Sequence, residues 1–136
     1  MNLEDLILNR YFGEFFNRGD WPVAEVILTP EIRFHGGVEI AGRENYVAFV
    51  KSLRTGFPDF HADLEDLFGN GAKFAARFTL RGTHLGMFVG IPPTSRKVEV
   101  AGMDLFRVEQ GRIAEIWGAV NALGLFQQLG RMPGQV

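Results

Sequence analysis

The chain has 136 residues, a formal net charge of −2, 46% apolar residues and 22% charged residues. This is the profile of one ordinary globular domain, and a chain of this length can bury a core without cross-links. It contains no cysteine, which excludes disulfides, thiolate nucleophiles and cysteine-ligated metal sites. We therefore predict a single domain over residues 1–136.

Charge and hydropathy also limit the partners of the protein. The small negative charge provides no general attraction to nucleic acid or to an anionic membrane. No apolar stretch approaches the roughly 20 residues that cross a bilayer, and residues 1–10 lack the pattern of a secretory signal. We expect a cytoplasmic protein with no nucleic-acid partner and no membrane partner.

Apolar residues in the first half of the chain recur at helical spacing. Between residues 3 and 18 they lie three or four positions apart, which predicts an amphipathic helix. A short helix is expected over 21–28 and a short strand over 32–35. A longer helix is predicted over 43–54, and Gly56 and Pro58 stop it.

From residue 60 onward the period of the apolar residues changes to two, which is typical of strands. Turn signals at Gly69-Asn70-Gly71 and Gln110-Gly111 indicate hairpins, and a further turn is expected over 92–95. A last helix is predicted over 122–129. Helices followed by hairpins predict an α+β domain whose helices pack on one face of a curved antiparallel sheet.

The turns also predict which residues lie side by side in the sheet. Counting outward from a two-residue turn at Gln110-Gly111 gives pairs on the last two strands. A longer loop centred near Pro92 would place His84 opposite Val100. The predicted pairs are Asp104 with Trp117, Gly102 with Ala119, and Val100 with Asn121.

A row of polar residues is expected on the apolar face of the sheet. Strict alternation places His84 and Asp104 on that face, and the predicted register adds Asn121. The backbones of His84 and Asn121 would lie about 10 Å apart, two strand spacings, so their side chains could hold a small planar molecule. Polar groups inside an apolar face are typical of a ligand pocket.

Several sequence motifs resemble those of a known family. Residues 81–94, RGTHLGMFVGIPPT, are similar to the GTHxGxFxGxPPT run of the SnoaL-like polyketide cyclases. Residues 102–108, 111–117 and 123–130 fit the same family, and the resemblance covers nearly the whole chain. Upstream matches are His35, Gly42-Arg43-Glu44 and Phe57-Pro58-Asp59.

The resemblance implies a nuclear transport factor-like cone, in which N-terminal helices close a strongly curved antiparallel sheet around an internal pocket. It also implies a homodimer through the outer sheet face, and neither a metal nor an organic cofactor. Members of this family close a ring by intramolecular aldol condensation, with a carboxylate at the end of the last strand as base. Here that position is Asn121, whose amide cannot take a proton at neutral pH but can donate to an enolate oxygen.

We predict three catalytic residues, and each has a structural alternative. His84 would be the acid or base, or it would bind the backbone of the loop beside Gly86. Asn121 would be the oxyanion donor, or it would cap the last helix. Asp104 would be a further base, or it would form a structural pair with an arginine or backbone donor. The predicted substrate-contacting residues are Trp117, Val100, Gly102, Ala119, Tyr11 and Phe78.

The favoured function is a cofactor-independent enzyme of secondary metabolism that acts on a hydrophobic carbonyl substrate by aldol cyclisation, isomerisation or dehydration. Two alternatives remain open. One is a cofactor-free hydroxylase-like relative. The other is a non-catalytic small-molecule-binding protein, which the missing carboxylate at Asn121 favours. No metal site is predicted, because His35 and His84 have no third ligand at a suitable spacing.

Overall fold

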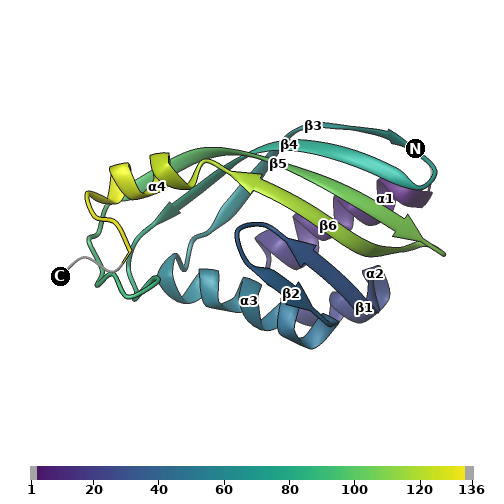
Figure 1. Cartoon of the computed structure of the whole chain (residues 1–136), viewed down its shortest axis with the longest axis horizontal. Coiled ribbons are helices and arrows are strands. Elements are labelled where there is room, and N and C mark those ends of the chain that lie inside the picture. The colour runs from purple at the N-terminus through teal and green to yellow at the C-terminus, as the bar shows by residue number, and fades with distance from the viewer. Residues whose placement is uncertain (1–2, 134–136) are drawn as a thin grey trace.

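A six-stranded sheet forms the frame of the protein, and α1 and α3 pack against one side of it (Figure 1). The computed structural model describes residues 3–133. The strands are β1 (Leu28–His35), β2 (Glu39–Ala41), β3 (His61–Asn70), β4 (Lys73–Thr83), β5 (Lys97–Glu109) and β6 (Arg112–Val120). The helical segments are α1 (Leu3–Arg10), η1 (Tyr11–Asn17), η2 (Trp21–Val23), α2 (Ala24–Ile27), α3 (Arg43–Gly56) and α4 (Ala122–Leu129).

The predicted α+β class is confirmed, but the sheet is mixed and stays open. Its strand order is β2-β1-β6-β5-β4-β3, and β1 runs parallel to β6 while every other neighbouring pair is antiparallel. The parallel pair joins a strand near the start of the chain to the last strand. Hairpin signals could not predict it, because no turn connects the two strands.

The helix predicted over 3–18 consists of an α-helix followed directly by a π-helix. After Arg10, α1 continues as the π-helix η1, which has wider turns than an α-helix. The aromatic residues of η1 are all buried, so this segment presents a broad aromatic face to the core. They are Tyr11, Phe12, Phe15 and Phe16.

The segment that follows is more extended than predicted. The helix expected over 21–28 is the short pair η2 and α2, and β1 already begins at Leu28. The pairing of β1 with β6 is irregular between Leu28 and Arg33. Pro30 lies within that irregular stretch and has no backbone N–H to donate to a neighbouring strand. The helix predicted over 43–54 is confirmed as α3.

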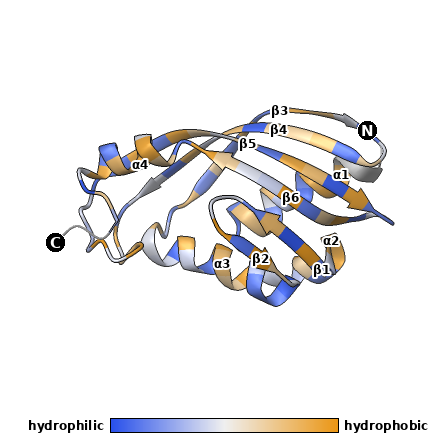
Figure 2. Cartoon of the chain, in the orientation of Figure 1, coloured by the Kyte–Doolittle hydropathy of each residue, from blue (hydrophilic) through white to orange (hydrophobic). Residues whose placement is uncertain are grey.

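Alternation of inward and outward residues is regular along β4 and β5, and hydropathy follows it (Figure 2). The pairing of β3 with β4 shifts register between Leu64 and Asp66. The hairpin turn between β3 and β4 lies one residue later than expected, because Asn70 pairs with Lys73. The buried inward residues of β4 are Phe74, Ala76, Phe78 and Leu80.

The predicted register between β5 and β6 is correct at the turn and wrong beyond it. Glu109 faces Arg112 as expected. A bulge follows, in which Val108 faces Ile113 and Arg107 faces Glu115, so Ala114 has no opposite residue on β5. All later pairs shift by one residue. The observed pairs are Asp104 with Gly118, Gly102 with Val120, and Leu105 with Trp117.

The predicted row of His84, Val100 and Asn121 does not form. Val100 faces Leu80 on β4, and the last pair of these strands is Thr83 with Lys97. His84 lies just beyond that pair, and its backbone N–H donates to the carbonyl of Arg96 at 2.9 Å. The β4–β5 loop is therefore centred about two residues earlier than expected, which moves His84 along the sheet from Val100.

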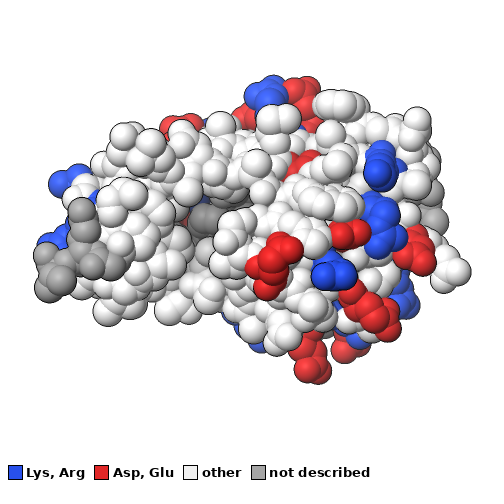
Figure 3. All heavy atoms as spheres, in the orientation of Figure 1, with Lys and Arg blue, Asp and Glu red and all other residues white. Residues whose placement is uncertain are grey.

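The core lies between the helices and the inner face of the sheet, and aromatic rings dominate it. Phe15, Phe57, Phe74 and Phe106 are among the largest fully buried side chains. Charged side chains on the face shown in Figure 3 gather over the end that carries β1 and β2, whereas the α4 end is mostly uncharged. Within residues 3–133, no helix is long and apolar enough to cross a bilayer.

Candidate active site

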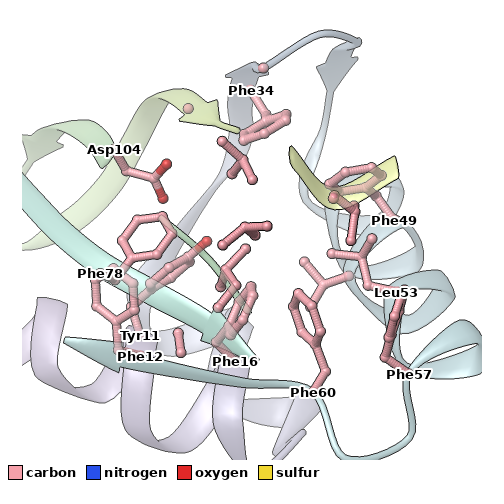
Figure 4. A pocket seen from close by; sticks show the side chains of 18 of the residues that line it. Tyr11, Phe12, Phe16, Phe34, Phe49, Leu53, Phe57, Phe60, Phe78 and Asp104 are labelled. Carbon is pink, nitrogen blue, oxygen red and sulfur yellow. The ribbon is translucent and has the colours of Figure 1, made fainter. Parts of the chain in front are cut away.

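A cavity of about 160 Å³ lies between the helices and the inner face of the sheet (Figure 4). A cavity of this size holds a ligand of roughly one aromatic ring without rearrangement. Its walls are mainly aromatic and aliphatic, and Asp104 is the only charged residue among the described residues that line it. Rings from η1, β1, α3, the stretch between α3 and β3, and β4 contribute. Those labelled in Figure 4 are Tyr11, Phe12, Phe16, Phe34, Phe49, Phe57, Phe60 and Phe78.

Asp104 reaches the cavity because its neighbours in the sheet are small. It lies on the inner face of β5, between Ala76 on β4 and Gly118 on β6. A Cβ atom added at Gly118 would lie 2.9 Å from Asp104 Oδ1. The absence of a side chain at position 118 therefore leaves the room that the carboxylate occupies.

The environment of Asp104 favours its neutral form. Burial raises the pKa of this carboxyl from 3.8 to about 7. The carboxylate has no hydrogen-bond partner among the described residues, so the structural pair that the sequence left open is not formed. A carboxyl group with a pKa near 7 can both take and return a proton at neutral pH.

Two tyrosine hydroxyls form the second polar group of the cavity. Tyr11 from η1 and Tyr46 from α3 are both buried, and their hydroxyls are hydrogen-bonded to each other. Burial raises the pKa of both phenols, and the nearby Asp104 carboxylate raises them further. Both therefore stay neutral, and the pair retains one O–H that can donate to a ligand.

Figure 4 shows Asp104 and Tyr11 on the same side of the cavity, with Phe49, Leu53 and Phe57 on the opposite side. A carboxyl group and a hydroxyl pair thus share one end of an otherwise apolar space. This arrangement provides a proton acceptor beside a hydrogen-bond donor in a mainly apolar site. Sequence periodicity placed Tyr46 among the apolar positions of a helix, and no signal indicated that its hydroxyl meets Tyr11.

His84 does not line the cavity. Its side chain is fully buried, and its Nδ1 accepts from the backbone N–H of Thr94 at 3.2 Å and lies 3.0 Å from Thr94 Oγ1. The ring of Phe57, which does line the cavity, lies 5.3 Å from the imidazole between ring centroids. The geometry thus favours the structural alternative, in which His84 ties the ends of the β4–β5 loop together.

Asn121 also has the structural role that was the alternative to a catalytic one. It is the N-cap of α4, and its side-chain oxygen accepts from the backbone N–H of Gly124 at 2.9 Å. The residue is exposed and does not line the cavity. Its side-chain amide caps α4, directly after the end of β6. Of the three predicted catalytic residues, Asp104 is therefore the one that faces the cavity.

The predicted substrate-contacting residues divide into two groups. Tyr11, Phe78 and Val100 line the cavity. Gly102 lies behind that wall, because a Cβ atom there would lie 2.4 Å from the ring of Phe78. Trp117 and Ala119 do not line the cavity, and the imidazole of His35 stacks on Trp117 with centroids 5.6 Å apart. The bulge at Ala114 is the reason, since it exchanges the inward and outward positions of β6 relative to the predicted register.

The family model of the SnoaL-like polyketide cyclases matches residues 6–129. Two relatives are named aklanonic acid methyl ester cyclases. DauD from Streptomyces sp. (strain C5) is 32% identical over 90% of this chain and 80% of its own. DnrD from Streptomyces peucetius is 33% identical over 90% of this chain and 88% of its own.

A solved structure shows the same fold. The structure of TsrD from Streptomyces laurentii superposes with a TM-score of 0.86 and 29% sequence identity, covering 96% of each chain. The whole described fold, including the parallel pair of β1 and β6, thus belongs to a known architecture. Together with the match over residues 6–129, this shows that the chain belongs to the SnoaL-like polyketide cyclase family.

Proposed function

We propose that the protein is a cofactor-independent acid–base enzyme that closes a ring in a hydrophobic carbonyl substrate. The observation that carries this proposal is Asp104, a carboxyl group with a pKa of about 7 at the wall of an aromatic cavity. A base of that strength suits removal of a proton next to a carbonyl group at neutral pH. The names of DauD and DnrD support a substrate of the polyketide type.

The proposed reaction uses one proton acceptor and one donor. The Asp104 carboxylate takes a proton from the carbon beside a carbonyl, and the Tyr11–Tyr46 pair donates a hydrogen bond to the oxygen on which negative charge develops. The enolate carbon then attacks a second carbonyl of the same molecule. The new alkoxide takes the proton back from Asp104, so the enzyme returns to its starting state.

This proposal places the base at Asp104 on β5 and not at the end of β6. The family position at the end of β6 is Asn121, and its amide caps α4. The small residues Ala76 and Gly118 beside Asp104 support the new position, because they give the carboxylate access to the cavity.

A test of the base uses a small bicyclic ketone, of which the ring that carries the carbonyl matches the volume of the cavity. We expect the protein to speed deuterium uptake from D₂O at the enolisable carbon of 2-tetralone, measured by proton NMR. Asp104→Asn should lower this rate by about 10²–10⁴-fold, the usual contribution of a general base. Asn121→Ser keeps a helix cap and serves as control, with an expected change of less than about twofold.

The same experiment separates the enzyme from a non-catalytic binding protein, which the capping role of Asn121 favours as second candidate. A binding protein would hold 2-tetralone without accelerating exchange. If wild-type protein binds the ketone, shown by chemical-shift changes of cavity residues, and exchange stays at the buffer rate, the enzyme proposal is wrong.

We also propose that two copies associate through the outer face of the sheet. Met103 and Leu105 on β5 are 57% and 39% exposed, which is unusual for apolar residues in the middle of a strand. Trp117 on β6 faces Leu105. Wild-type protein should therefore sediment as a dimer, and Met103→Lys should shift it to the monomer. A monomeric wild-type protein at tens of micromolar would contradict this assembly.

A further inference from the structure

The imidazole of His84 contains a polar atom that no residue between 3 and 133 satisfies. The side chain is fully buried, and its Nε2 atom has no hydrogen-bond partner in this part of the chain. Buried donors are almost always paired, so an unpaired one requires a physical explanation. The acid–base chemistry proposed above does not use this residue.

The contacts of the other ring nitrogen identify Nε2 as a donor. The backbone N–H of Thr94 points at Nδ1, and Nδ1 must accept that bond. The Thr94 hydroxyl, which accepts from the N–H of Arg96, has its own hydrogen free for the same nitrogen. With Nδ1 occupied as acceptor, the proton of the neutral ring is on Nε2. His84 therefore presents an N–H group in a fixed direction.

The aromatic neighbours of His84 do not replace a hydrogen-bond acceptor. The ring of Phe57 is tilted by only 30° from the imidazole, so an N–H bond in the imidazole plane cannot point squarely at the face of Phe57. The ring of Phe88 is nearly perpendicular, but its centroid lies 6.4 Å away, at the far end of the range of ring contacts (about 4.5–7 Å). Nε2–H is shielded from solvent without being bonded.

The same two rings separate His84 from the cavity. Phe57 and Phe88 both line the cavity and both contact the imidazole, so His84 lies one ring layer behind its wall. Asp104 lies at the other end of the cavity. Val98, which also lines the cavity, is six residues from Asp104 along β5. It pairs with Gly82, two residues before His84. Six residues of strand span about 20 Å.

Phe88 is the more easily moved of the two rings. It is half-buried and sits at the base of a two-residue turn, with Val89 at φ 41° and Gly90 at φ 81°. Positive φ is a strained conformation for a β-branched residue, and such strain is typical of segments that move around ligands. Val89 is also 54% exposed, so little packing holds the tip in place. Phe88 packs on Phe126 of α4, at the end of the molecule where α4 lies (Figure 1).

From these observations we propose that the binding site continues past Phe88 to a second polar subsite, where His84 Nε2–H donates a hydrogen bond to an oxygen of the bound molecule. Displacement of Phe88 would join this subsite to the cavity. The ligand class follows from the two ends: an elongated, mainly apolar molecule with one oxygen group near Asp104 and another near His84. This inference rests on the proposed function, because it extends the site at which Asp104 acts.

The test compares a long probe with a short one. Emodin has three fused rings with oxygens along both edges and at one end, and it covers about half of the ~20 Å span, enough to fill the part of the site toward His84. By contrast, 2-tetralone has two rings and one oxygen. With ¹⁵N-labelled histidine the three histidines of the chain are separately observable. Saturation with emodin should shift the His84 Nε2–H signal downfield, as expected for a new hydrogen bond, whereas 2-tetralone should leave that signal in place.

Variants measure the contribution of the bond. His84→Asn can keep an acceptor near the Nδ1 position but loses the Nε2 donor. It should lower the ratio of emodin affinity to 2-tetralone affinity about tenfold, the effect of one hydrogen bond. Phe88→Ala removes the separating ring and should bind emodin more tightly than the wild type. The matched control His61→Asn changes a half-exposed histidine on β3 and should leave the ratio unchanged within about twofold.

The outcomes are distinguishable. If emodin binds without moving the His84 signal, or if His84→Asn leaves the affinity ratio as in the wild type, the subsite is disproved. Binding of 2-tetralone in the same samples would then show that the cavity at Asp104 still binds a ligand, so the proposed function would be unaffected by the loss of the subsite. If neither probe binds to the wild type or to Phe88→Ala, the subsite and the proposed function are both wrong.

Discussion

The hydroxyls of Tyr11 and Tyr46 are hydrogen-bonded to each other in the cavity, although the two residues are 35 positions apart in the chain. The bond joins η1 to α3 at the point where both face the sheet. Each phenol satisfies the other, which removes the cost of burying two hydroxyls in an aromatic space. The pair therefore stabilises the fold and positions a donor beside Asp104.

Removing one hydroxyl of this pair should destabilise the protein more than removing both. Tyr46→Phe leaves the buried Tyr11 hydroxyl unpaired, which costs about 1–3 kcal/mol in the free energy of unfolding. The double variant Tyr11→Phe, Tyr46→Phe has no unpaired group and should recover most of that loss. Urea unfolding of the four proteins of this cycle measures the coupling between the hydroxyls. Strictly additive losses would contradict the bond.

For the same variants we expect the catalytic rate to change in a different way from the stability. The double variant should fold well but exchange deuterium into 2-tetralone about 10²-fold more slowly, because no donor remains for the developing oxyanion. A double variant with wild-type exchange would exclude the tyrosine pair from the reaction.

Asp104 should make the protein less stable as the pH rises. Its pKa in the folded state is about 7, above the value of 3.8 that it has when exposed, so the folded state holds the proton longer. The contribution of this group to stability is greatest at low pH, falls between about pH 4 and pH 7, and is constant above. Asp104→Asn removes this penalty and should gain about 4 kcal/mol over the wild type at pH 8, with little gain at pH 4.

Urea unfolding at both pH values checks this prediction. Asp66→Asn is the matched control, because Asp66 lies on the exposed part of β3 and pairs with Arg77 at 2.7 Å. It should change the free energy of unfolding by less than about 1 kcal/mol at either pH. A gain for Asp104→Asn of the same size at pH 4 and pH 8 would contradict a raised pKa.

Much of the frame could be predicted from local signals. Alternation along β5 correctly directed Asp104 to the inner face, and the turn at Gln110-Gly111 set the start of β6. The bulge at Ala114 was not predicted, because counting outward from the turn assumes that every residue of one strand has a partner on the other. One unpaired residue was enough to exchange the faces of β6, and Trp117 was wrongly placed in the cavity for that reason alone.

The contacts between side chains in the candidate site could not be predicted from sequence periodicity. The meeting of Tyr11 with Tyr46 needs the packing angle of two helices, which apolar spacing leaves open. For His84 and Asn121, the structural alternatives that the sequence offered fit the contacts observed. Polar residues beside turns and helix starts serve the backbone more often than a ligand.

His35 should stabilise the junction of β1, β2 and β6 in a pH-dependent way. Its Nδ1 contacts Glu39 at 2.7 Å and its Nε2 contacts Glu115 at 2.6 Å, while Glu115 also accepts from Arg107. The hydrogen bonds to Glu39 and then Glu115 raise the pKa of the imidazole. Stability from this group is complete below the unfolded pKa of about 6.5 and is lost as the pH rises through the higher folded value.

A histidine-specific titration checks this. The His35 signals of ¹⁵N-labelled protein should titrate above pH 6.5, and Glu115→Gln should lower that midpoint by removing one of the two carboxylates. His35→Gln should be less stable than the wild type at pH 6, and the difference should shrink at higher pH. A difference that grows with pH would mean that His35 is neutral in the folded protein.

Gly118 should be required for catalysis because it makes room for Asp104. In Gly118→Ala the new methyl group would lie 2.9 Å from Asp104 Oδ1 and 3.2 Å from the ring of Phe34, so the carboxylate must turn away. A displacement of about 1 Å at a catalytic group costs up to 10²-fold in rate. Deuterium exchange into 2-tetralone should fall by at least tenfold while the variant remains folded.

Gly13→Ala is the matched control, since an added Cβ there meets nothing within 4 Å and alanine favours a helix. Wild-type exchange in Gly118→Ala would place the reacting proton away from Asp104, and the base would then have to be sought elsewhere in the cavity.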